Sequence, residues 1–200
     1  MDADVSFEML WGVARWFEAA GVPWAFGGGW AVDLALNRVT REHKDVDVVL
    51  WFDDQLTAQR WLLSDGWRLQ VARGGALAPW QPGERFALPE HNVWCRHEAH
   101  EPGFVELLFN VRDEACWRYR RDLEVSMPLE RALYTSASGL PALAPEIALL
   151  YKSSQPDDPW NHADLHAALP ALSEDARRWL IEALRRANPA HPWLVTLTMP

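Results

Sequence analysis

The stretch FGGGWAVDLALNRVTREHKDVDVVL, residues 26–50, decides the fold of this chain. Its three consecutive glycines, Gly27 to Gly29, stand between a short apolar strand at 24–26 and a helical segment at 30–37. Glycines at such a turn let backbone N–H groups approach a ligand closely, and the N-terminus of the following helix favours an anion such as phosphate. A plain tight turn is the competing interpretation, so the glycines alone decide nothing.

Two aspartates, Asp45 and Asp47, begin the apolar strand that we predict over residues 45–52. Residues i and i+2 of a strand project on the same face, so the two carboxylates point together and repel each other unless a cation lies between them. Mg²⁺ commonly binds one or two carboxylates together with the phosphates of a substrate. The solvent face of an edge strand is the alternative, but the apolar run VVLWF that follows indicates a strand entering the core.

Glu106 is a lone acid in GFVELLFN, an otherwise apolar strand predicted over residues 103–110. A buried unpaired carboxylate is costly, so such a residue usually has a partner or a function. An outward-facing position on an edge strand is the competing explanation. The glycine turn, the paired aspartates and the lone glutamate support one another because they follow in this order along one chain.

Helical and strand patterns alternate in the first part of the chain, and helices alone are predicted near its end. A Pro/Gly-rich loop is expected at 74–83. The further predicted strands are 67–72 and 91–97. The further predicted helices are 5–20, 54–65, 145–154, 161–172 and 173–187. We expect an α+β fold, in which a mixed β-sheet core flanked by helices (1–140) precedes a small C-terminal helical bundle (141–200).

Composition excludes several classes of protein. A chain of 200 residues with 49% hydrophobic and 24% charged residues can bury a core without metal or disulfide staples. Its net charge of −9, with no basic stripe, argues against general nucleic-acid binding. The two cysteines imply no disulfide framework. No apolar run has the length of a membrane span and the acidic start is unlike a secretory signal, so we expect no membrane association and a cytoplasmic location.

The stretch at 26–50 resembles the nucleotidyltransferase superfamily of the DNA polymerase β type. Within it, the resemblance is to the antibiotic-modifying branch, the aminoglycoside 2''-adenylyltransferases and lincosamide nucleotidyltransferases. Those proteins share the pattern GGW…D…R.TR.H.D.D. The matching residues here are Gly28, Gly29, Trp30, Asp33, Arg38, Thr40, Arg41, His43, Asp45 and Asp47. The tail, with its APEIALLYKSS segment, resembles the lysine-bearing C-terminal bundle of such enzymes, although their Lys-Asp-x-x-Asp turn is reduced here to one acid, Asp164.

The resemblance implies an enzyme that moves a nucleoside monophosphate, AMP from ATP or another nucleoside triphosphate, to a hydroxyl of a small molecule. An aminoglycoside- or lincosamide-like antibiotic is the implied acceptor. Two Mg²⁺ ions would be held by the catalytic carboxylates, with Glu106 binding the second metal or accepting the hydroxyl proton. The implied catalytic and metal-binding residues are Asp45, Asp47 and Glu106. The implied nucleotide-binding residues are Gly28, Gly29, Trp30, Arg41, His43 and Lys152.

Two other functions stay open at the level of sequence. Some members of the superfamily modify proteins or RNA ends, often as half of a toxin–antitoxin pair, although the acidic composition disfavours an RNA end. A catalytically silent nucleotide-binding module is the other alternative, and the intact pair Asp45 and Asp47 disfavours it. In small members of the family a second subunit can complete the acceptor cleft, so a homodimer is a further expectation.

The sequence has an unusually high number of tryptophans, 13, and eight of them fall into two groups. We expect one group in the core because its members fall on apolar faces of predicted helices and strands. These core candidates are Trp11, Trp16, Trp51, Trp61 and Trp179. The candidates to wall an acceptor cleft are Trp80, on the predicted loop, and Trp94 and Trp117, near the Glu106 strand. For His91, Cys95 and His97, ordinary strand positions are favoured over a zinc site.

Overall fold

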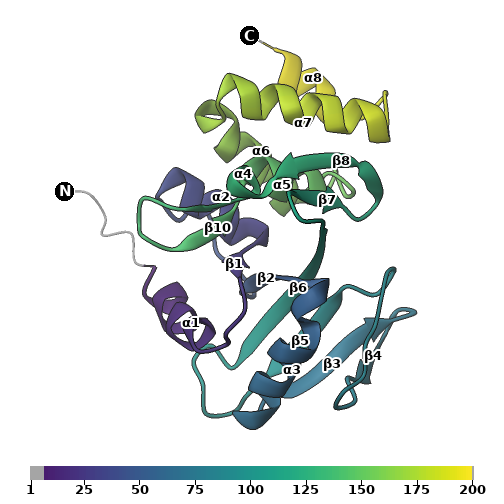
Figure 1. Ribbon diagram of the computed structural model, residues 1–200. Helices are drawn as coiled ribbons and strands as arrows, with labels where there is room; N and C mark the ends of the chain where they lie inside the picture. Colours follow the sequence, from purple (N-terminus) through teal and green to yellow (C-terminus); the bar gives the residue numbers. More distant parts are fainter. Residues whose placement is uncertain (1–6, 200) are drawn as a thin grey trace, which may run out of the picture.

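A mixed ten-stranded sheet organises the molecule in the computed structural model, which describes residues 7–199 (Figure 1). Eight strands lie side by side in the order β4-β3-β5-β6-β2-β1-β10-β9, and the hairpin β7–β8 continues from β6. Two pairs, β2–β6 and β1–β10, are parallel, and the other pairs are antiparallel. The strands are β1 (Ala25–Phe26), β2 (Asp47–Trp51), β3 (Arg68–Arg73), β4 (Ala76–Pro79), β5 (Asn92–Arg96), β6 (Phe104–Arg112), β7 (Cys116–Tyr119), β8 (Asp122–Pro128), β9 (Leu133–Thr135) and β10 (Pro141–Leu143).

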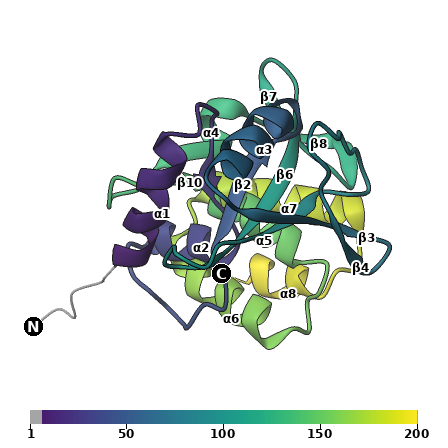
Figure 2. The same cartoon turned by 90° about the horizontal axis from the view of Figure 1, so that it is seen from below.

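Helices cover the sheet, and the last four follow one another at the end of the chain. Figure 1 shows α7 and α8 at the opposite end of the molecule from α3 and β3, and Figure 2 shows α1 on the other side from β3 and β4. No described helix is long and apolar enough to cross a membrane. The α-helices are α1 (Glu8–Glu18), α2 (Gly28–Leu36), α3 (Gln55–Ser64), α4 (Leu129–Ala132), α5 (Pro145–Lys152), α6 (Pro159–Ala168), α7 (Glu174–Ala187) and α8 (Trp193–Thr198), and the 3₁₀ turns are η1 (Phe52–Asp54) and η2 (Leu169–Ala171).

The apolar run of β2 separates two hydrophobic clusters. Val48 and Leu50 pack in one cluster with residues of α1 and α3, whereas Val49 and Trp51 pack in the other with residues of α5, α7 and α8. Successive side chains of a strand point to opposite faces, so a continuous apolar run is what a strand buried on both faces requires. The predicted α+β fold with a helical C-terminal part is confirmed. The division at residue 140 stays a prediction.

The loop expected at 74–83 is partly wrong, because β4 pairs there with β3 as an antiparallel hairpin. Gly74 and Gly75 form its turn with positive φ angles of 53° and 82°. Two consecutive residues with positive φ match the twist of the flanking strands, and glycine adopts that conformation without steric cost. The short edge strand β4 was not predicted because proline and glycine are typical of loops. The helix expected from residue 30 also begins earlier, at Gly28.

Three tryptophans were assigned to the wrong environment. Trp80 and Trp117, expected in a cleft, are buried, and each indole N–H donates inside the protein, to the Glu84 carbonyl and to Asn110 Oδ1 respectively. Trp11, expected in the core, is 40% exposed. The side chain of a large amphipathic residue such as tryptophan is placed by the partners it finds in three dimensions, and helical spacing alone does not name them.

Asp164 of α6 joins the C-terminal helices to the segment that follows α2. Its buried carboxylate accepts two hydrogen bonds from Arg41, Nε to Oδ1 at 2.7 Å and Nη2 to Oδ2 at 2.8 Å. Lys152 Nζ, at the end of α5, lies 2.7 Å from Oδ2. Burial by itself would raise the pKa of Asp164, but the two cations outweigh it and hold the pKa below its usual value. The carboxylate is therefore ionised and paired.

Replacing Trp80 by alanine is expected to lower the free energy of unfolding by about 3–5 kcal/mol, because the large buried ring leaves a cavity. The ring packs edge-on against Phe86, with 5.2 Å between centroids. Urea denaturation measures the loss. Leu123→Ala, at a side chain that is 51% exposed, is the control and should change the value by less than about 0.5 kcal/mol. A Trp80→Ala protein of wild-type stability would contradict the assignment of this ring to the core.

Replacing Asp164 by asparagine should lower the free energy of unfolding by about 3–5 kcal/mol, because two cations lose their buried counter-charge. Equilibrium denaturation at pH 7 tests this. The matched control is Asp175→Asn, whose carboxylate is 73% exposed and pairs only with Arg178 one turn along the same helix. That surface pair contributes about 0–1 kcal/mol. Equal effects of the two substitutions would refute a structural role for Asp164.

Candidate active site

The start of α2 lies directly against Asp47. Gly27 is the extended residue before the helix, and its N–H donates to the Asp47 carbonyl at 2.9 Å. Gly28 has a φ of 55°, and a Cβ atom on it would overlap the Asp47 carboxylate. A Cβ on Gly29 would overlap the Arg41 guanidinium. The glycines are therefore required because the helix start, the carboxylate and the guanidinium approach one another more closely than any side chain allows.

Parallel pairing of β2 with β6 brings the third acid to the first two. Asp47 and Glu106 are register partners on these neighbouring strands, and Asp45 lies two residues before Asp47. Each of the three offers a carboxylate oxygen, and these oxygens all lie within 4.8 Å of one another. Within residues 7–199 this is the one group of acid, histidine or cysteine side chains close enough to share a metal ion. Three hard oxygen ligands suit Mg²⁺.

The surroundings of Asp47 and Glu106 disfavour the charged forms of these two carboxyl groups. Burial, together with the charges of Asp45 and Glu106, raises the pKa of Asp47 to about 8, although Lys152 and Arg41 act in the opposite direction. Burial likewise raises the pKa of Glu106, and the hydrogen bond from Asn92 partly offsets this. At neutral pH the cluster holds a proton unless a cation neutralises it, so its residues fit a divalent metal ion.

Glu106 is held in place by its neighbour on β5. Asn92 Nδ2 donates to Glu106 Oε1 at 2.6 Å, and this leaves the second carboxylate oxygen available to a metal ion or a proton. Trp94 is the register partner of Glu106 on the same strand. The lone acid of the apolar strand thus has both a partner and an open side, as its position in the sequence suggested.

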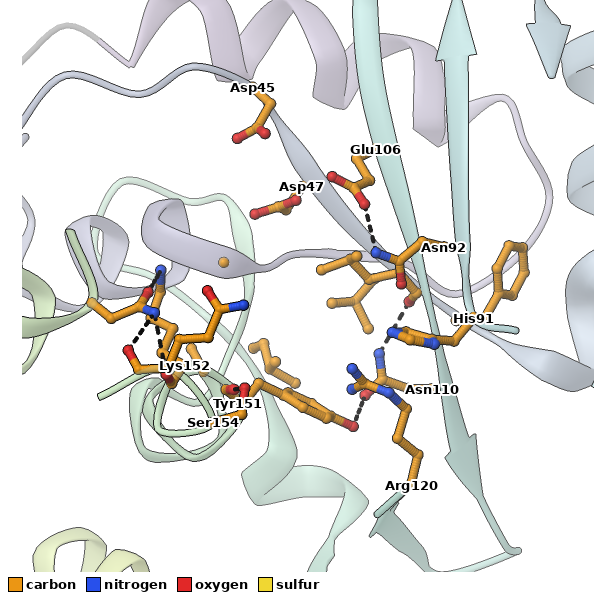
Figure 3. A pocket seen from close by; sticks show the side chains of 18 residues that line it. Asp45, Asp47, His91, Asn92, Glu106, Asn110, Arg120, Tyr151, Lys152 and Ser154 are labelled. Atoms are coloured by element: carbon orange, nitrogen blue, oxygen red, sulfur yellow. Dashed lines mark hydrogen bonds between the residues drawn. The ribbon is translucent and has the colours of Figure 1, made fainter. Parts of the chain in front are cut away.

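A cavity of about 430 Å³ opens beside the acids, between β2 and β6 on one side and α5 with the start of α6 on the other. Figure 3 shows the three carboxylates at one end and Lys152, Tyr151 and Arg120 at the other. The Arg120 guanidinium lies 4.3 Å from the centre of the Tyr151 ring. Burial lowers the pKa of Arg120. Gly28 also lines the cavity. One end can therefore hold a cation and the other an anion.

A chain of hydrogen bonds fixes the segment between α2 and β2. Arg41 Nη1 lies 3.3 Å from His43 Nδ1, and since a guanidinium only donates, that ring nitrogen accepts. His43 Nε2 then donates to the buried Asp33 Oδ2 at 2.6 Å. The other Asp33 oxygen accepts from the Thr40 hydroxyl and N–H. The residues of the motif from Asp33 to His43 thus form one connected polar network, which holds Arg41 towards Asp164.

Not every expected nucleotide contact lines the large cavity. Gly28 and Lys152 do, together with the three acids. Trp30 is buried, stacks on His43 with 3.8 Å between ring centres, and donates its indole N–H to the Asp45 carbonyl. The lining of the large cavity also lacks Gly29, Arg41 and His43. Trp30 and His43 therefore act on the site by holding the backbone and the network around Asp45.

Sequence patterns missed three contributors to the site. Asn92 orients Glu106, Tyr151 forms a wall of the cavity, and Arg120 supplies a cation at its far end. Strand pairing would have found Asn92, because β5 and β6 are antiparallel neighbours. Nothing local distinguishes Arg120 from the arginines beside it. Cys95 is fully buried in β5, and within residues 7–199 the only group of side chains close enough to share a metal ion is the acid cluster.

Part of the sequence matches a known protein family. Residues 9–72 match the family model of the aminoglycoside-2''-adenylyltransferases. The match includes Gly28, Asp45 and Asp47 and ends before Glu106. No curated protein matches the sequence significantly.

Solved structures extend the likeness beyond the matched segment. A crystal structure of ANT(2'')-Ia in complex with adenylyl-2''-tobramycin has 14% identity and a TM-score of 0.61, covering 90% of this chain and 97% of that one. The solution structure of the antibiotic-resistance factor ANT(2'')-Ia has 15% identity and a TM-score of 0.59, with 92% of each chain covered. The lincosamide antibiotic adenylyltransferase LnuA, lincomycin-bound, has 17% identity and a TM-score of 0.58, covering 85% and 100%.

These comparisons confirm the nucleotidyltransferase-like α+β fold, and together with the family match they support nucleotidyltransferase activity. The chain resembles the aminoglycoside- and lincosamide-modifying branch of the nucleotidyltransferases, in sequence over residues 9–72 and in fold over most of its length.

Proposed function

We propose that this protein transfers AMP from ATP to a hydroxyl group of a small antibiotic-like molecule in a Mg²⁺-dependent reaction. The observation that carries the proposal is the convergence of Asp45, Asp47 and Glu106 at the start of α2, at one end of a cavity whose other end carries Lys152 and Arg120. A nucleotide with its metal ions has the matching arrangement, since its phosphates are anionic and its metal ions need oxygen ligands.

The cavity suggests how the nucleotide lies. The triphosphate would lie along the N-terminus of α2, where backbone N–H groups and the helix dipole favour negative charge, with Lys152 beside it. Asp45 and Asp47 would hold Mg²⁺, which would supply positive charge to the phosphate oxygens. Asp164 keeps Lys152 and Arg41 oriented towards this region.

The reaction exchanges one phosphorus–oxygen bond for another. The acceptor oxygen attacks the α-phosphorus in line, a new P–O bond forms, and the bond to the β-phosphate breaks, which releases pyrophosphate. The hydroxyl proton leaves with the attack, and the Glu106 carboxylate would accept it. Asn92 keeps this carboxylate oriented.

The antibiotic class of the acceptor is supported by the relatives. The structures of ANT(2'')-Ia with adenylyl-2''-tobramycin and of lincomycin-bound LnuA share the fold at 14% and 17% identity. Incubation with Mg-ATP and a panel of antibiotics, followed by mass spectrometry for a gain of one AMP, tests the proposal. No gain on any acceptor would refute it. ATP as the preferred nucleotide, a homodimer and a cytoplasmic location stay predictions.

Asp45→Asn and Asp47→Asn should each lower kcat by about 100-fold or more, because each removes a negative ligand of the metal ions. Mass-spectrometric or pyrophosphate-release rates measure this. Asp53→Asn is the control, since that side chain follows the same strand but is 74% exposed. It should keep the wild-type rate. Near wild-type turnover in Asp47→Asn would instead favour a binding module that does no chemistry.

Without metal, Asp47 should lower the stability of the protein as the pH rises. Its pKa is raised to about 8 in the folded state, against 3.8 as the ordinary value, so between these values the folded state holds a proton that the unfolded state has lost. The free energy of unfolding therefore falls as the pH rises through this window. The stabilisation that the proton on Asp47 provides is fully present only below about pH 4. Asparagine mimics the protonated acid and removes this dependence.

Urea denaturation in EDTA at pH 5 and pH 8 checks the expectation. The stability difference, Asp47→Asn minus wild type, should be larger at pH 8 than at pH 5. Adding Mg²⁺ at pH 8 should stabilise the wild type and leave the variant nearly unchanged. A difference that is independent of pH, or equal stabilisation of both proteins by Mg²⁺, would contradict a coupled acid cluster that binds metal.

A further inference from the structure

Asp45 borders a second hollow on the other side of the acid cluster. This hollow, which we call the sheet groove, has a volume of about 380 Å³ and lies between the beginning of α1 and strands β5 and β6. It is defined by Met9, Lys44, Asp45, Arg96, Pro102 and Phe104, among other residues. Neither Gly28 nor Lys152 lines it. It is therefore adjacent to the acids but separate from the proposed phosphate end of the large cavity.

In-line transfer places the acceptor in this groove. The entering oxygen and the leaving pyrophosphate lie on opposite sides of the α-phosphorus. If the phosphates lie between Gly28 and Lys152, the hydroxyl must approach the acids from the side away from them. The sheet groove opens on that side, because Phe104 stands two residues before Glu106 on the same face of β6.

Phe104 and Arg96 both line the groove, and Trp94 packs against Phe104 without lining it. Trp94 is paired with Glu106, and its ring meets that of Phe104 edge-on, with 5.4 Å between centroids. The Arg96 guanidinium lies 4.8 Å from the centre of the Phe104 ring and 5.9 Å from that of Trp94. Among residues 7–199, no carboxylate lies within ion-pair distance of Arg96. Its donors therefore face the groove without an acid partner.

The charges around the groove disfavour a polycation. Lys44 and Arg96 are its cations, and its one acid is the proposed metal ligand Asp45. A neighbouring smaller hollow beside α6 adds Arg41 and one further acid, Asp158. That acid caps α6, where Oδ1 accepts from two backbone N–H groups at 2.8 and 3.1 Å. Within residues 7–199, the groove itself thus has two cations against one carboxylate, and that carboxylate is the proposed metal ligand.

The net charge of −9 does not reverse this local balance. Exposed charges more than about 10 Å apart are largely screened at 0.1 M salt, whereas groups in the groove act on the acceptor at contact distance. A buried or half-buried ammonium group without a counter-charge is costly. The cations that face the groove thus decide which acceptors bind.

We infer that the acceptor is a hydroxyl compound without a cluster of ammonium groups, uncharged or anionic, whose flat or apolar face packs on Phe104 while an oxygen accepts from Arg96. This inference rests on the proposed function and narrows it: among antibiotic-like acceptors, polycationic aminoglycosides are excluded. Arg96 is the residue that determines this specificity.

A matched pair of probes tests the inference. The compounds 4-(hydroxymethyl)benzoate and 4-(hydroxymethyl)benzylamine carry the same ring and hydroxyl but opposite charges, and tobramycin serves as the polycation. With Mg-ATP, kcat/KM for adenylylation should be at least tenfold higher for the benzoate than for the benzylamine, and tobramycin should be a poor acceptor. Arg96→Glu should reverse the preference of the pair by at least tenfold, and Arg96→Gln should reduce it.

Arg68→Glu is the matched control. Arg68 is the register partner of Arg96 on β3, but its side chain is 69% exposed, pairs with Glu98 and does not line the groove. This variant should keep the wild-type preference. Tobramycin or the benzylamine as the best acceptor, or a preference unchanged in Arg96→Glu, would overturn the inference and leave the proposed function standing.

Measurements of equilibrium binding distinguish a failure of the proposed AMP transfer from a failure of the inferred acceptor specificity. If no probe accepts AMP, the proposed transfer fails, and the inference is then decided by equilibrium binding of the two probes to protein loaded with Mg²⁺ and α,β-methylene-ATP. Tighter binding of the benzoate, lost in Arg96→Glu, supports the specificity of the groove. Equal or weaker binding of the benzoate refutes it.

Discussion

The buried carboxylate of Asp164 is the interaction on which the arrangement of the site depends. It pairs with Arg41, in the segment between α2 and β2, and with Lys152 at the end of α5. Arg41 in turn contacts His43, whose ring reaches the buried Asp33 of α2. One continuous set of polar contacts therefore ties the C-terminal helices to the glycine-turn motif. The large cavity lies between the strands that carry the acids and the helix that carries Lys152, and these contacts hold the two sides together.

The acids of the cluster differ from Asp164 in the charges that surround them. Asp164 is ionised because two cations face it, whereas burial, together with the charges of Asp45 and Glu106, raises the pKa of Asp47 to about 8. The same physical terms, burial and neighbouring charge, thus give opposite results at two acids in one site. The first result stabilises the fold. At Asp47 the charged carboxylate is unfavourable unless a cation lies beside it, and a divalent cation would meet this requirement. This is the physical reason for assigning the chemistry to the carboxylates rather than to the aromatic residues.

Much of the fold followed from periodicity and composition. The strand that begins at Asp47 was recognisable because an uninterrupted apolar run is what a doubly covered strand requires, and the helices near the end of the chain were recognisable by their spacing. The β4 strand was missed because prolines and glycines at 74–83 are typical of loops, yet Gly74 and Gly75 close a hairpin. Trp80 was placed in a cleft for the same reason. A residue in a segment called a loop can still be buried by contacts from distant residues.

The elements of the candidate site could be read from the sequence alone: a glycine turn before a helix, two aspartates with a common face, and a glutamate in an apolar strand. Local spacing suffices for these features because side chains two residues apart on a strand always project together. Only the tertiary structure decided that β2 pairs with β6 in the register that joins Glu106 to Asp47, and that Arg96 faces the groove beside them. Strand register and the position of an exposed arginine depend on the packing of segments far apart in the chain, which no local pattern records.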